Sequence, residues 1–585
     1  MFFGIMFFIF CFSFLFPINC RAISEFTITE NIEYLLSLSG QATVTHQINF
    51  TNNLSQIYPT EYQIQISGLP LSDLSASDDE GNILTDFSSK DGLSLIKLKF
   101  NEAKVGKNQI TTFKLIYKIA DLAKNKGKTW EIALPQTIEN SPTTSQVSLK
   151  TPSEFGSLSF ASIPAKFEDG LTQNITTFKN NSSSKILIIF GNYQLFDFTL
   201  NYHLKNPSPN KVTSEIALIP DTYSQSVYYQ SISPPPKGIK IDPDGNWLAQ
   251  YEINPSEELD ITATGQVKTG LHLPQTNGNL ENYLQPQTFW PISDPQIQSI
   301  LGKVDTPRSI YDYVISTLEY DYNRLNNSSR LGPIAALNNP QSSLCTEFTD
   351  LFVTLARAKG IPAREIQGFA YSSDQKIKPL SLNNDILHAW PEYYDSKLKS
   401  WKAIDPTWGK TTNGIDYFNN LDLNHITFVT HGLSSEYPLP AGSYQKDQNT
   451  KSVFIDFATQ DLKYEQTLPR VYFQKNKLIF QNQSPNSQKN ISISSAKLSY
   501  TQKLESILPY SSLQISLPKM PFLSSLSTKN QKITLVLTND EGQSSTQTLN
   551  YPPHFINLGL CIILSLIILS ISGIIITNLT HEKNS

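Results

Sequence analysis

The spacing of apolar residues changes twice along these 585 residues, and each change restricts the folds that the chain can adopt. From about residue 25 to 270, apolar and polar side chains alternate, as in residues 196–204 (FDFTLNYHL). A period of two is typical of strands with one buried face. Turn-forming clusters such as residues 242–246 (DPDGN) separate these strands. The pattern therefore predicts β-sandwich modules with hardly any helix in this half of the chain.

Helical periodicity begins after Gly270, where prolines interrupt the strand pattern. Thr306-Pro307 predicts a helix start, with a capping hydroxyl followed by proline in the first turn. A second helix is predicted from Cys345, because apolar residues recur at helical spacing until residues 360–362 (GIP) end it. Beyond about residue 440 the alternation returns, which predicts a further β module before the C-terminal apolar segment.

Two apolar segments near the ends of the chain predict export and membrane attachment. Residues 1–22 begin with about fifteen apolar residues, too few to cross a bilayer comfortably, which favours a cleaved signal peptide. Lipidation of Cys20 is the alternative interpretation. Residues 555–577 are uncharged and long enough for a transmembrane helix. Because a lysine follows this span and no lysine or arginine directly precedes it, we expect residues 578–585 in the cytoplasm and the large N-terminal region outside.

The predicted order is a signal peptide, two β modules, a helix-containing domain, an immunoglobulin-like β module, a transmembrane helix and a short tail. Their predicted limits are 1–22, 23–150, 151–270, 271–440, 441–552, 555–577 and 578–585. Lysine and arginine total 46 against 51 aspartate and glutamate, and the net charge of -5 gives no electrostatic reason to expect a nucleic-acid partner.

Of four cysteines, only Cys345 lies between the two apolar end segments. It therefore has no partner there for an internal disulfide, which leaves burial as a small core residue or reactivity as its role. A thiol reacts as the thiolate, and a helix N-terminus with a nearby imidazolium lowers a thiol pKa from about 8.5 to roughly 3.5–7.5. Of eight histidines, only His388, His425 and His431 follow Cys345 within the same predicted domain.

His388 is the preferred base because of a predicted hairpin. Residues 388–394 (HAWPEYY) and 401–405 (WKAID) flank a polar reversal and read as two antiparallel strands. Pairing around that turn places His388 opposite or diagonal to Asp405, within roughly 5 to 8 Å. The acid would orient the imidazole, which takes the thiol proton and later returns one to the leaving group. A register slip of one residue would separate the two side chains.

These residues carry a resemblance to a known family. Residues 318–322 (LEYDY), 343–364 (SLCTEFTDLFVTLARAKGIPAR), 388–392 (HAWPE) and 401–407 (WKAIDPT) resemble the core of the transglutaminase-like superfamily, a papain-like cysteine fold. The resemblance implies Cys345 as nucleophile, His388 as base and Asp405 as orienting acid. The resemblance covers about a fifth of the chain and implies nothing about the flanking β modules, beyond the fact that exported bacterial members of this family commonly carry such modules and a membrane span. Many members have glycine near the position before the cysteine, where this chain has Ser343-Leu344, which implies a narrower approach to the thiol.

The expected fold is multidomain: an α+β papain-like, transglutaminase-like core flanked by β-sandwich modules, with a C-terminal transmembrane helix. The expected function is a membrane-anchored thiol enzyme that forms an acyl-enzyme at Cys345 from a protein or peptide amide outside the cell. Either water or an amine would accept the acyl group, giving hydrolysis or cross-linking. The alternative is a non-catalytic adhesion or scaffold protein with a degenerate domain.

Further site residues are predicted around the triad. The backbone N–H of Cys345 and the side chain of Tyr322 are candidate oxyanion donors. Trp390, Trp401 and Trp408 could shape a groove, although core packing is the favoured interpretation. We expect no cofactor and no metal, because acidic clusters such as residues 78–81 lack the spaced oxygen ligands of a calcium loop.

Overall fold

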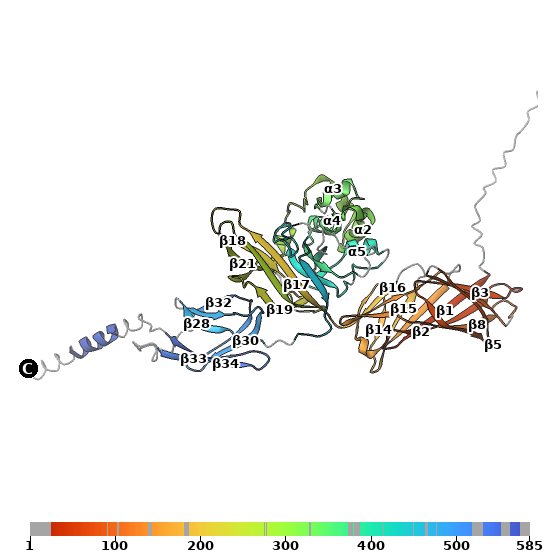
Figure 1. The fold of residues 1–585 in the computed structure, drawn as a ribbon, viewed down its shortest axis with the longest axis horizontal. Helices are drawn as coiled ribbons and strands as arrows, with labels where there is room; N and C mark the ends of the chain where they lie inside the picture. Colours follow the sequence, from red (N-terminus) through yellow and green to blue (C-terminus); the bar gives the residue numbers. More distant parts are fainter. Residues whose placement is uncertain are drawn as a thin grey trace, which may run out of the picture. The chain divides into compact units, whose positions relative to one another are not determined.

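A computed structural model describes residues 25–573 of the chain, apart from short gaps (Figure 1). The gaps are 91, 102–103, 139–142, 181–185, 274, 276–277, 327–328, 373–377, 380–386, 413–414, 420, 448–449, 463–465, 475–476, 517–530 and 552–561. Two compact units divide these residues. The first comprises residues up to 123 with 133–154 and 164–184, and the second comprises 124–132, 155–163 and residues from 185 onward.

The first unit contains two sheets that share a core. An eight-stranded sheet has the order β14-β15-β12-β1-β2-β8-β4-β5, and a four-stranded sheet has the order β11-β3-β7-β6. The rings of Phe50 and Phe113, from the larger sheet, lie 5.0 and 5.8 Å from the ring of Tyr62 in the smaller one. The strands are β1 (Phe26–Leu36), β2 (Ala42–Asn52), β3 (Glu61–Ser67), β4 (Leu71–Asp78), β5 (Gly81–Asn82), β6 (Leu84–Lys90), β7 (Leu93–Lys99), β8 (Ile110–Ile119), β11 (Gln136–Ile138), β12 (Thr143–Pro152), β14 (Lys166–Glu168) and β15 (Gln173–Asn180). The predicted strand-rich character of this half is confirmed.

The second unit combines several smaller sheets with all the α-helices described before residue 562. Its sheet orders are β13-β16-β10-β9, β19-β22-β17-β27, β18-β21-β20, β25-β24-β23-β26, β28-β29-β32 and β31-β30-β33-β34. The helices are α1 (Pro295–Ile300), α2 (Pro307–Thr317), α3 (Gly332–Asn338), α4 (Cys345–Ala358) and α5 (Pro406–Thr411). Short 3-10 turns cover Ser153–Phe155, Leu280–Leu284, Leu301–Lys303 and Tyr322–Asn326.

The strands of the second unit that precede α1 are β9 (Ala123–Lys126), β10 (Thr129–Leu134), β13 (Leu158–Ala161), β16 (Ile186–Phe190), β17 (Gln194–Lys205), β18 (Val212–Leu218), β19 (Gln225–Ser233), β20 (Gly238–Ile241), β21 (Trp247–Ile253) and β22 (Glu258–Thr269). Those that follow are β23 (Ala363–Ala370), β24 (His388–Asp395), β25 (Ser400–Ala403), β26 (His425–His431), β27 (Val453–Phe457), β28 (Arg470–Gln474), β29 (Lys477–Gln481), β30 (Gln488–Ser495), β31 (Tyr500–Ile507), β32 (Ser512–Ser516), β33 (Gln531–Thr538) and β34 (Ser544–Tyr551).

The sheet β25-β24-β23-β26 has a strand-rich core on one side and helix α4 on the other. Phe369 of β23 and Phe428 of β26 belong to the same apolar cluster as Phe198 and Leu200 of β17. Helix α4 packs on β23 and β24, and Figure 1 shows α2, α3 and α5 gathered around it. The sheet therefore forms a platform between a β core and a helical layer.

Strand β27 belongs to the sheet β19-β22-β17-β27, called the middle sheet below, although it follows the helix-containing segment in sequence. It pairs antiparallel with β17, from Phe196 opposite Phe457 to Leu200 opposite Val453. The predicted limit at residue 441 assigns this strand to the C-terminal module instead, because alternation identifies a strand but not the sheet that it joins. The remaining strands after β27 form two sheets that share one apolar cluster, including Phe480, Ile493 and Leu535.

The two predicted end segments fall largely outside the described residues. The predicted signal peptide, residues 1–22, lies wholly outside them, and of the predicted span at 555–577 only residues 562–573 are described, as helix. Among the described residues, no helix is both long enough and apolar enough to cross a membrane.

Helix α4 begins where the sequence predicts, and a buried carboxylate secures its first turn. Glu347 accepts hydrogen bonds from the backbone N–H of Leu344 at 2.8 Å and of Leu331 at 2.7 Å. Arg324 pairs with the same carboxylate at 3.2 Å. Gly360, at a φ of 77°, follows the C-terminal end, where a residue without Cβ adopts this backbone at little cost.

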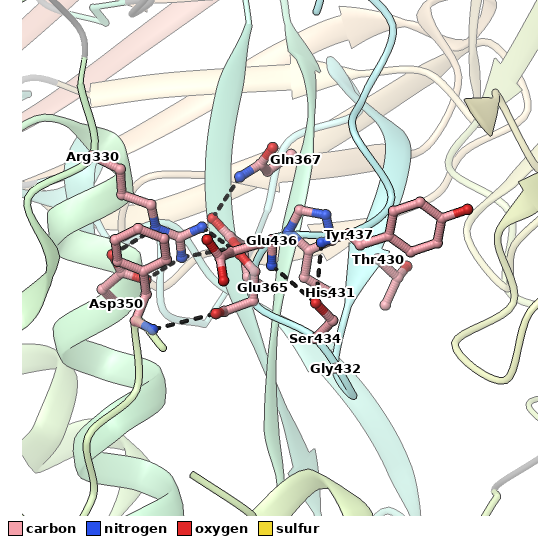
Figure 2. A network of polar contacts seen from close by, with 12 residues as sticks. Arg330, Asp350, Glu365, Gln367, Thr430, His431, Gly432, Ser434, Glu436 and Tyr437 are labelled. Carbon is pink, nitrogen blue, oxygen red and sulfur yellow. Dashed lines mark hydrogen bonds and ion pairs between the residues drawn. The ribbon is translucent and has the colours of Figure 1, made fainter. Parts of the chain in front are cut away.

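A buried ion network ties α4 to the sheet (Figure 2). The Arg330 guanidinium donates to Asp350 of α4 at 2.9 Å and to Glu365 of β23 at 3.0 Å. His431 of β26 lies 3.0 Å from the same Glu365 carboxylate, and Trp290 donates its indole N–H to Asp350 at 3.0 Å. Both carboxylate side chains are 0% exposed. One cation therefore links the helix directly to β23, and His431 extends the network to β26.

We expect Arg330→Met to destabilise this unit strongly. Removing one partner of a buried ion pair leaves uncompensated charge and costs roughly 3–5 kcal/mol. Urea unfolding of the full chain, followed by tryptophan fluorescence, measures the change in the free energy of unfolding.

Arg308→Met is the matched control. Arg308 also pairs with two carboxylates, on Asp312 and Asp416, but its side chain is 46% exposed. Its loss should therefore change the free energy of unfolding by at most about 1 kcal/mol. Equal effects of the two substitutions would contradict the structural role of the Arg330 network.

Candidate active site

Cys345 is the first residue of α4, with Leu344 as the N-cap residue. The thiol therefore lies at the positive end of the helix dipole, as the sequence predicts. Cys345 and Leu344 are both 1% exposed. The segment before the helix is anchored by pairing between Ser343 and Tyr320, and the N–H of Asp321 donates to the Ser343 carbonyl at 2.9 Å.

The predicted hairpin around residues 395–399 is confirmed. Strands β24 and β25 pair antiparallel, from Glu392 opposite Ala403 to Asp395 opposite Ser400. This register, continued past β25, leaves Asp405 diagonal to His388, and their side chains meet with 2.9 Å between Oδ2 and Nε2. The structure therefore brings the predicted base and acid together.

Asp405 also makes a hydrogen bond at the start of helix α5, which holds its side chain in place. It is the N-cap of α5, and its Oδ1 accepts the backbone N–H of Trp408 at 3.0 Å. One carboxylate oxygen therefore caps a helix while the other faces His388. This division fixes the side-chain rotamer of Asp405 before any substrate is considered.

A glycine allows the neighbouring strands to lie close enough for this geometry. Gly368 of β23 is opposite His388 on one side and Thr427 of β26 on the other, next to an irregularity in the β23–β26 register. A Cβ at position 368 would lie 1.9 Å from the Ile426 carbonyl oxygen. Any side chain here would push β26 away from β23.

His388 and Asp405 are a buried pair with opposite shifts of pKa. Burial lowers the pKa of His388, but Asp405 and then Cys345 outweigh it and raise this pKa from 6.5 to about 9. Burial raises the pKa of Asp405, but His388 and then His425 outweigh it and lower this pKa to about 2. Nε2 faces Asp405, which leaves the buried Nδ1 as the other ring nitrogen, and a hydrogen bond with the Cys345 side chain contributes to the raised pKa of this ring. Since the Cys345 side chain is among the groups acting on this ring, Nδ1 is the atom positioned to exchange a proton with the thiol.

Aromatic rings enclose the imidazole of His388. Trp408 is stacked on it, with 5.0 Å between ring centroids and 19° between planes, and the Trp390 ring lies 5.9 Å away. Trp390, Trp401 and Trp408 are all buried. These tryptophans are core residues, as favoured from the sequence, rather than the lining of an open groove.

The candidate oxyanion donors differ in position. The backbone N–H of Cys345 lies in the first turn of α4. Tyr322 is 44% exposed, and its ring contacts that of Tyr320 edge to face, with centroids 4.9 Å apart. Their role as donors stays a prediction.

Two residues without a predicted role also belong to the site. His425, the first residue of β26, lies with Nε2 3.5 Å from Oδ2 of Asp405, and its Nδ1 is 2.8 Å from Asp422. The spacing of Asp422 and His425 in the sequence is compatible with a local pair, but nothing local indicates the contact with Asp405. The polar atoms of His388, Asp405 and His425 lie within 4.8 Å of one another, and because these groups pair with one another they form an ion-paired cluster rather than an assigned metal site.

Comparison with known proteins identifies the domain. Residues 292–406, which include Cys345, His388 and Asp405, match the model of the transglutaminase-like superfamily, and the chain therefore contains a transglutaminase-like domain. No curated protein matches the chain. The resemblance seen in the sequence is confirmed.

Solved structures show partial similarity. A candidate cysteine protease from Cytophaga hutchinsonii is 18% identical, over 46% of this chain and 98% of that one, with a TM-score of 0.29. The periplasmic domain of TgpA from Pseudomonas aeruginosa is 13% identical, over 38% and 91%, with a TM-score of 0.20. An M1 zinc metallopeptidase from Deinococcus radiodurans is 10% identical, over 33% and 45%, with a TM-score of 0.21.

The pKa of His388 predicts a defined pH dependence of stability. A folded-state pKa of about 9, above the usual 6.5, means that folding favours the protonated ring. The resulting stabilisation, roughly 3 kcal/mol at most, is fully present below pH 6.5 and is lost as the pH rises through 9.

Urea unfolding at several pH values tests this prediction in a Cys345→Ala background, where no thiol at position 345 titrates in the same window; because Cys345 contributes to the raised pKa of His388, the loss should then occur somewhat below pH 9. The difference in free energy of unfolding between this protein and its His388→Gln derivative should shrink as the pH is raised. A difference that stays constant from pH 6 to 10 would contradict the assigned protonation of His388.

Proposed function

We propose that this chain is a thiol enzyme that forms an acyl-enzyme on Cys345 from a protein or peptide amide. The observation that carries the proposal is the arrangement of His388, with Nε2 on the Asp405 carboxylate and Nδ1 left for the Cys345 thiol. A thiol at a helix start, a base and an orienting acid are the parts that nucleophilic acyl transfer requires.

The proposed reaction begins from the ion pair in which Nδ1 of His388 holds the proton that the Cys345 thiol has given up. The sulfur attacks the amide carbonyl, and the positive end of α4 stabilises the negative charge that develops on the oxygen. The C–N bond then breaks as His388 returns the proton to the leaving nitrogen, which departs as an amine. This step leaves a thioester on the sulfur of Cys345.

The thioester is resolved by water or by a second amine. His388 removes a proton from the acceptor as it attacks, the C–S bond breaks, and the thiolate regains a proton. Water gives a carboxylic acid and an amine gives a new amide. Cys345 is 1% exposed, so neighbouring side chains must move to admit the substrate, and this movement governs how much water enters with it.

We include an exported, membrane-anchored location in the proposal. The apolar leader in residues 1–22 and the uncharged apolar segment at 555–577 support it. In this arrangement the substrates are proteins or peptides outside the cytoplasm.

Trapping of the thioester tests the proposed function. Purified full chain is mixed with a glutamine-containing protein such as casein, with and without a dansyl-labelled primary amine, and adducts on Cys345 are mapped by mass spectrometry. We expect a hydroxylamine-sensitive adduct in the native chain, no adduct in Cys345→Ala, and a rate reduced about 10²–10⁴-fold in His388→Ala.

The distribution of products identifies the acceptor. Dansyl incorporation indicates amine transfer, and new carboxylates or cleaved peptide bonds indicate hydrolysis. A second measurement is alkylation of Cys345 by iodoacetamide as a function of pH. If no adduct forms, and if alkylation of the native chain begins only near pH 8.5 and His388→Ala leaves it unchanged, the chain is a scaffold rather than an enzyme.

A further inference from the structure

A second histidine and carboxylate lie directly behind His388 and Asp405. Oδ2 of Asp405, 2.9 Å from Nε2 of His388, is also 3.5 Å from Nε2 of His425. On the far side of that ring, Nδ1 lies 2.8 Å from Oδ1 of Asp422. Together with the Cys345 thiol, these side chains form a continuous row of five polar groups inside the protein.

The end of this row is firmly anchored. Oδ2 of Asp422 pairs with the ammonium of Lys378 at 3.2 Å and lies 3.5 Å from the Tyr417 hydroxyl, while Oδ1 accepts the Asn424 N–H at 3.1 Å. The Asp422 side chain is 0% exposed. Burial raises the pKa of Asp422, but Lys378 and His425 outweigh it and hold this pKa well below its usual range.

Two tryptophans hold both imidazole rings in one packed cluster. The Trp408 ring lies 5.0 Å from that of His388 and 4.7 Å from that of His425. The Trp390 ring lies 5.9 and 5.0 Å from the same two rings. The imidazole centroids are 5.8 Å apart. Neither ring can rotate without displacing an indole, so the row keeps its order.

The two carboxylates that flank His425 favour its charged form. Nδ1 of His425 is hydrogen-bonded to Asp422 at 2.8 Å, whereas Nε2, 3.5 Å from Oδ2 of Asp405, is at the separation of an ion pair and makes no hydrogen bond there. Burial lowers the pKa of His425, but Asp422 first and Asp405 in addition raise it above its usual value. The ring next to Asp405, on the side away from His388, is therefore one whose charged form is favoured by two flanking carboxylates.

We propose that His425, held by Asp422, is a positioning residue that keeps the Asp405 carboxylate ionised and turned toward His388. This inference rests on the proposed function, because it explains what keeps Asp405, the acid of the proposed triad, ionised and oriented. Without a cation at position 425, Asp405 would take up a proton at higher pH. His388 would then lose the partner that stabilises its charged form, and the thiolate would lose its imidazolium.

The charge of His425 can be changed without touching the triad. Asp422→Asn removes the carboxylate that makes the largest contribution to raising the pKa of His425, whereas Asp422→Glu keeps a negative charge. The measurement is the rate of Cys345 alkylation by iodoacetamide from pH 2.5 to 10 in the full chain, so that the window reaches toward the pKa of Asp405, about 2. Melting temperatures at pH 7 verify that each variant is folded.

We expect Asp422→Asn to move the low-pH edge of the alkylation profile upward by about one unit, since loss of an opposite charge within 4–6 Å changes a pKa by roughly 1–3 units. Asp422→Glu should retain the native profile. A purely structural role for Asp422 would lower the melting temperature without moving this edge. If Asp422→Asn does not fold, His425→Gln provides the same test and should produce the same upward shift.

His431→Gln is the matched control. His431 is a buried histidine on the same strand, but its nitrogens lie 3.0 Å from Glu365 and 2.7 Å from the Pro438 carbonyl. This variant should lose stability and keep the native pH edge. A folded Asp422→Asn or His425→Gln protein whose profile coincides with the native one overturns the inference while the proposed function stands. A native thiol without low-pH reactivity, unaffected by His388→Ala, overturns both.

Discussion

The Arg330 guanidinium is the contact on which the geometry of the site depends. Asp350 in the second turn of α4 and Glu365 of β23 bind the same cation, and His431 extends the network to β26. Because Cys345 begins α4 and β23 lies between the strands that start at His388 and His425, this network sets the helix against the sheet. A slide of α4 along the sheet would leave a buried carboxylate without its cation, at a cost of several kcal/mol. An apolar interface alone would resist such a slide less, because the hydrophobic effect is non-directional and does not favour one register of the helix.

In the candidate active site, basic and acidic side chains also alternate. From His388 through Asp405, His425 and Asp422 to Lys378, each ionised group contacts one or two of opposite charge. In a low-dielectric interior this order keeps every charge paired, whereas two adjacent like charges would force one to neutralise. The row therefore favours an alternating pattern of charge, which the proposed reaction would use. Preorganised charge of this kind requires little rearrangement when the reaction begins.

Local patterns predicted the parts of the site that local physics determines. The helix start at Cys345 follows from apolar spacing, and the meeting of His388 with Asp405 follows from strands flanking a short reversal. Arg330 escaped prediction because it lies outside regular structure and its carboxylate partners resemble ordinary polar positions. The contact of His425 with Asp405 escaped for a related reason: it depends on how two separate segments are packed around β23 and its glycine. The strand-rich modules were predictable as elements, but their allocation to sheets was not, as β27 illustrates.

Because β27 pairs with β17, the transglutaminase-like segment is inserted in sequence between two neighbouring strands of one sheet, rather than following that sheet as a separate domain. Residues 206–452 separate these two neighbouring strands in sequence. During synthesis from the N-terminus, the edge of β17 that pairs with β27 stays uncovered until that whole stretch has been made. Until then an apolar strand edge is open to pairing with other chains. Closure of the middle sheet therefore follows synthesis of the transglutaminase-like segment, so a truncation before residue 453 would leave an exposed, aggregation-prone strand edge.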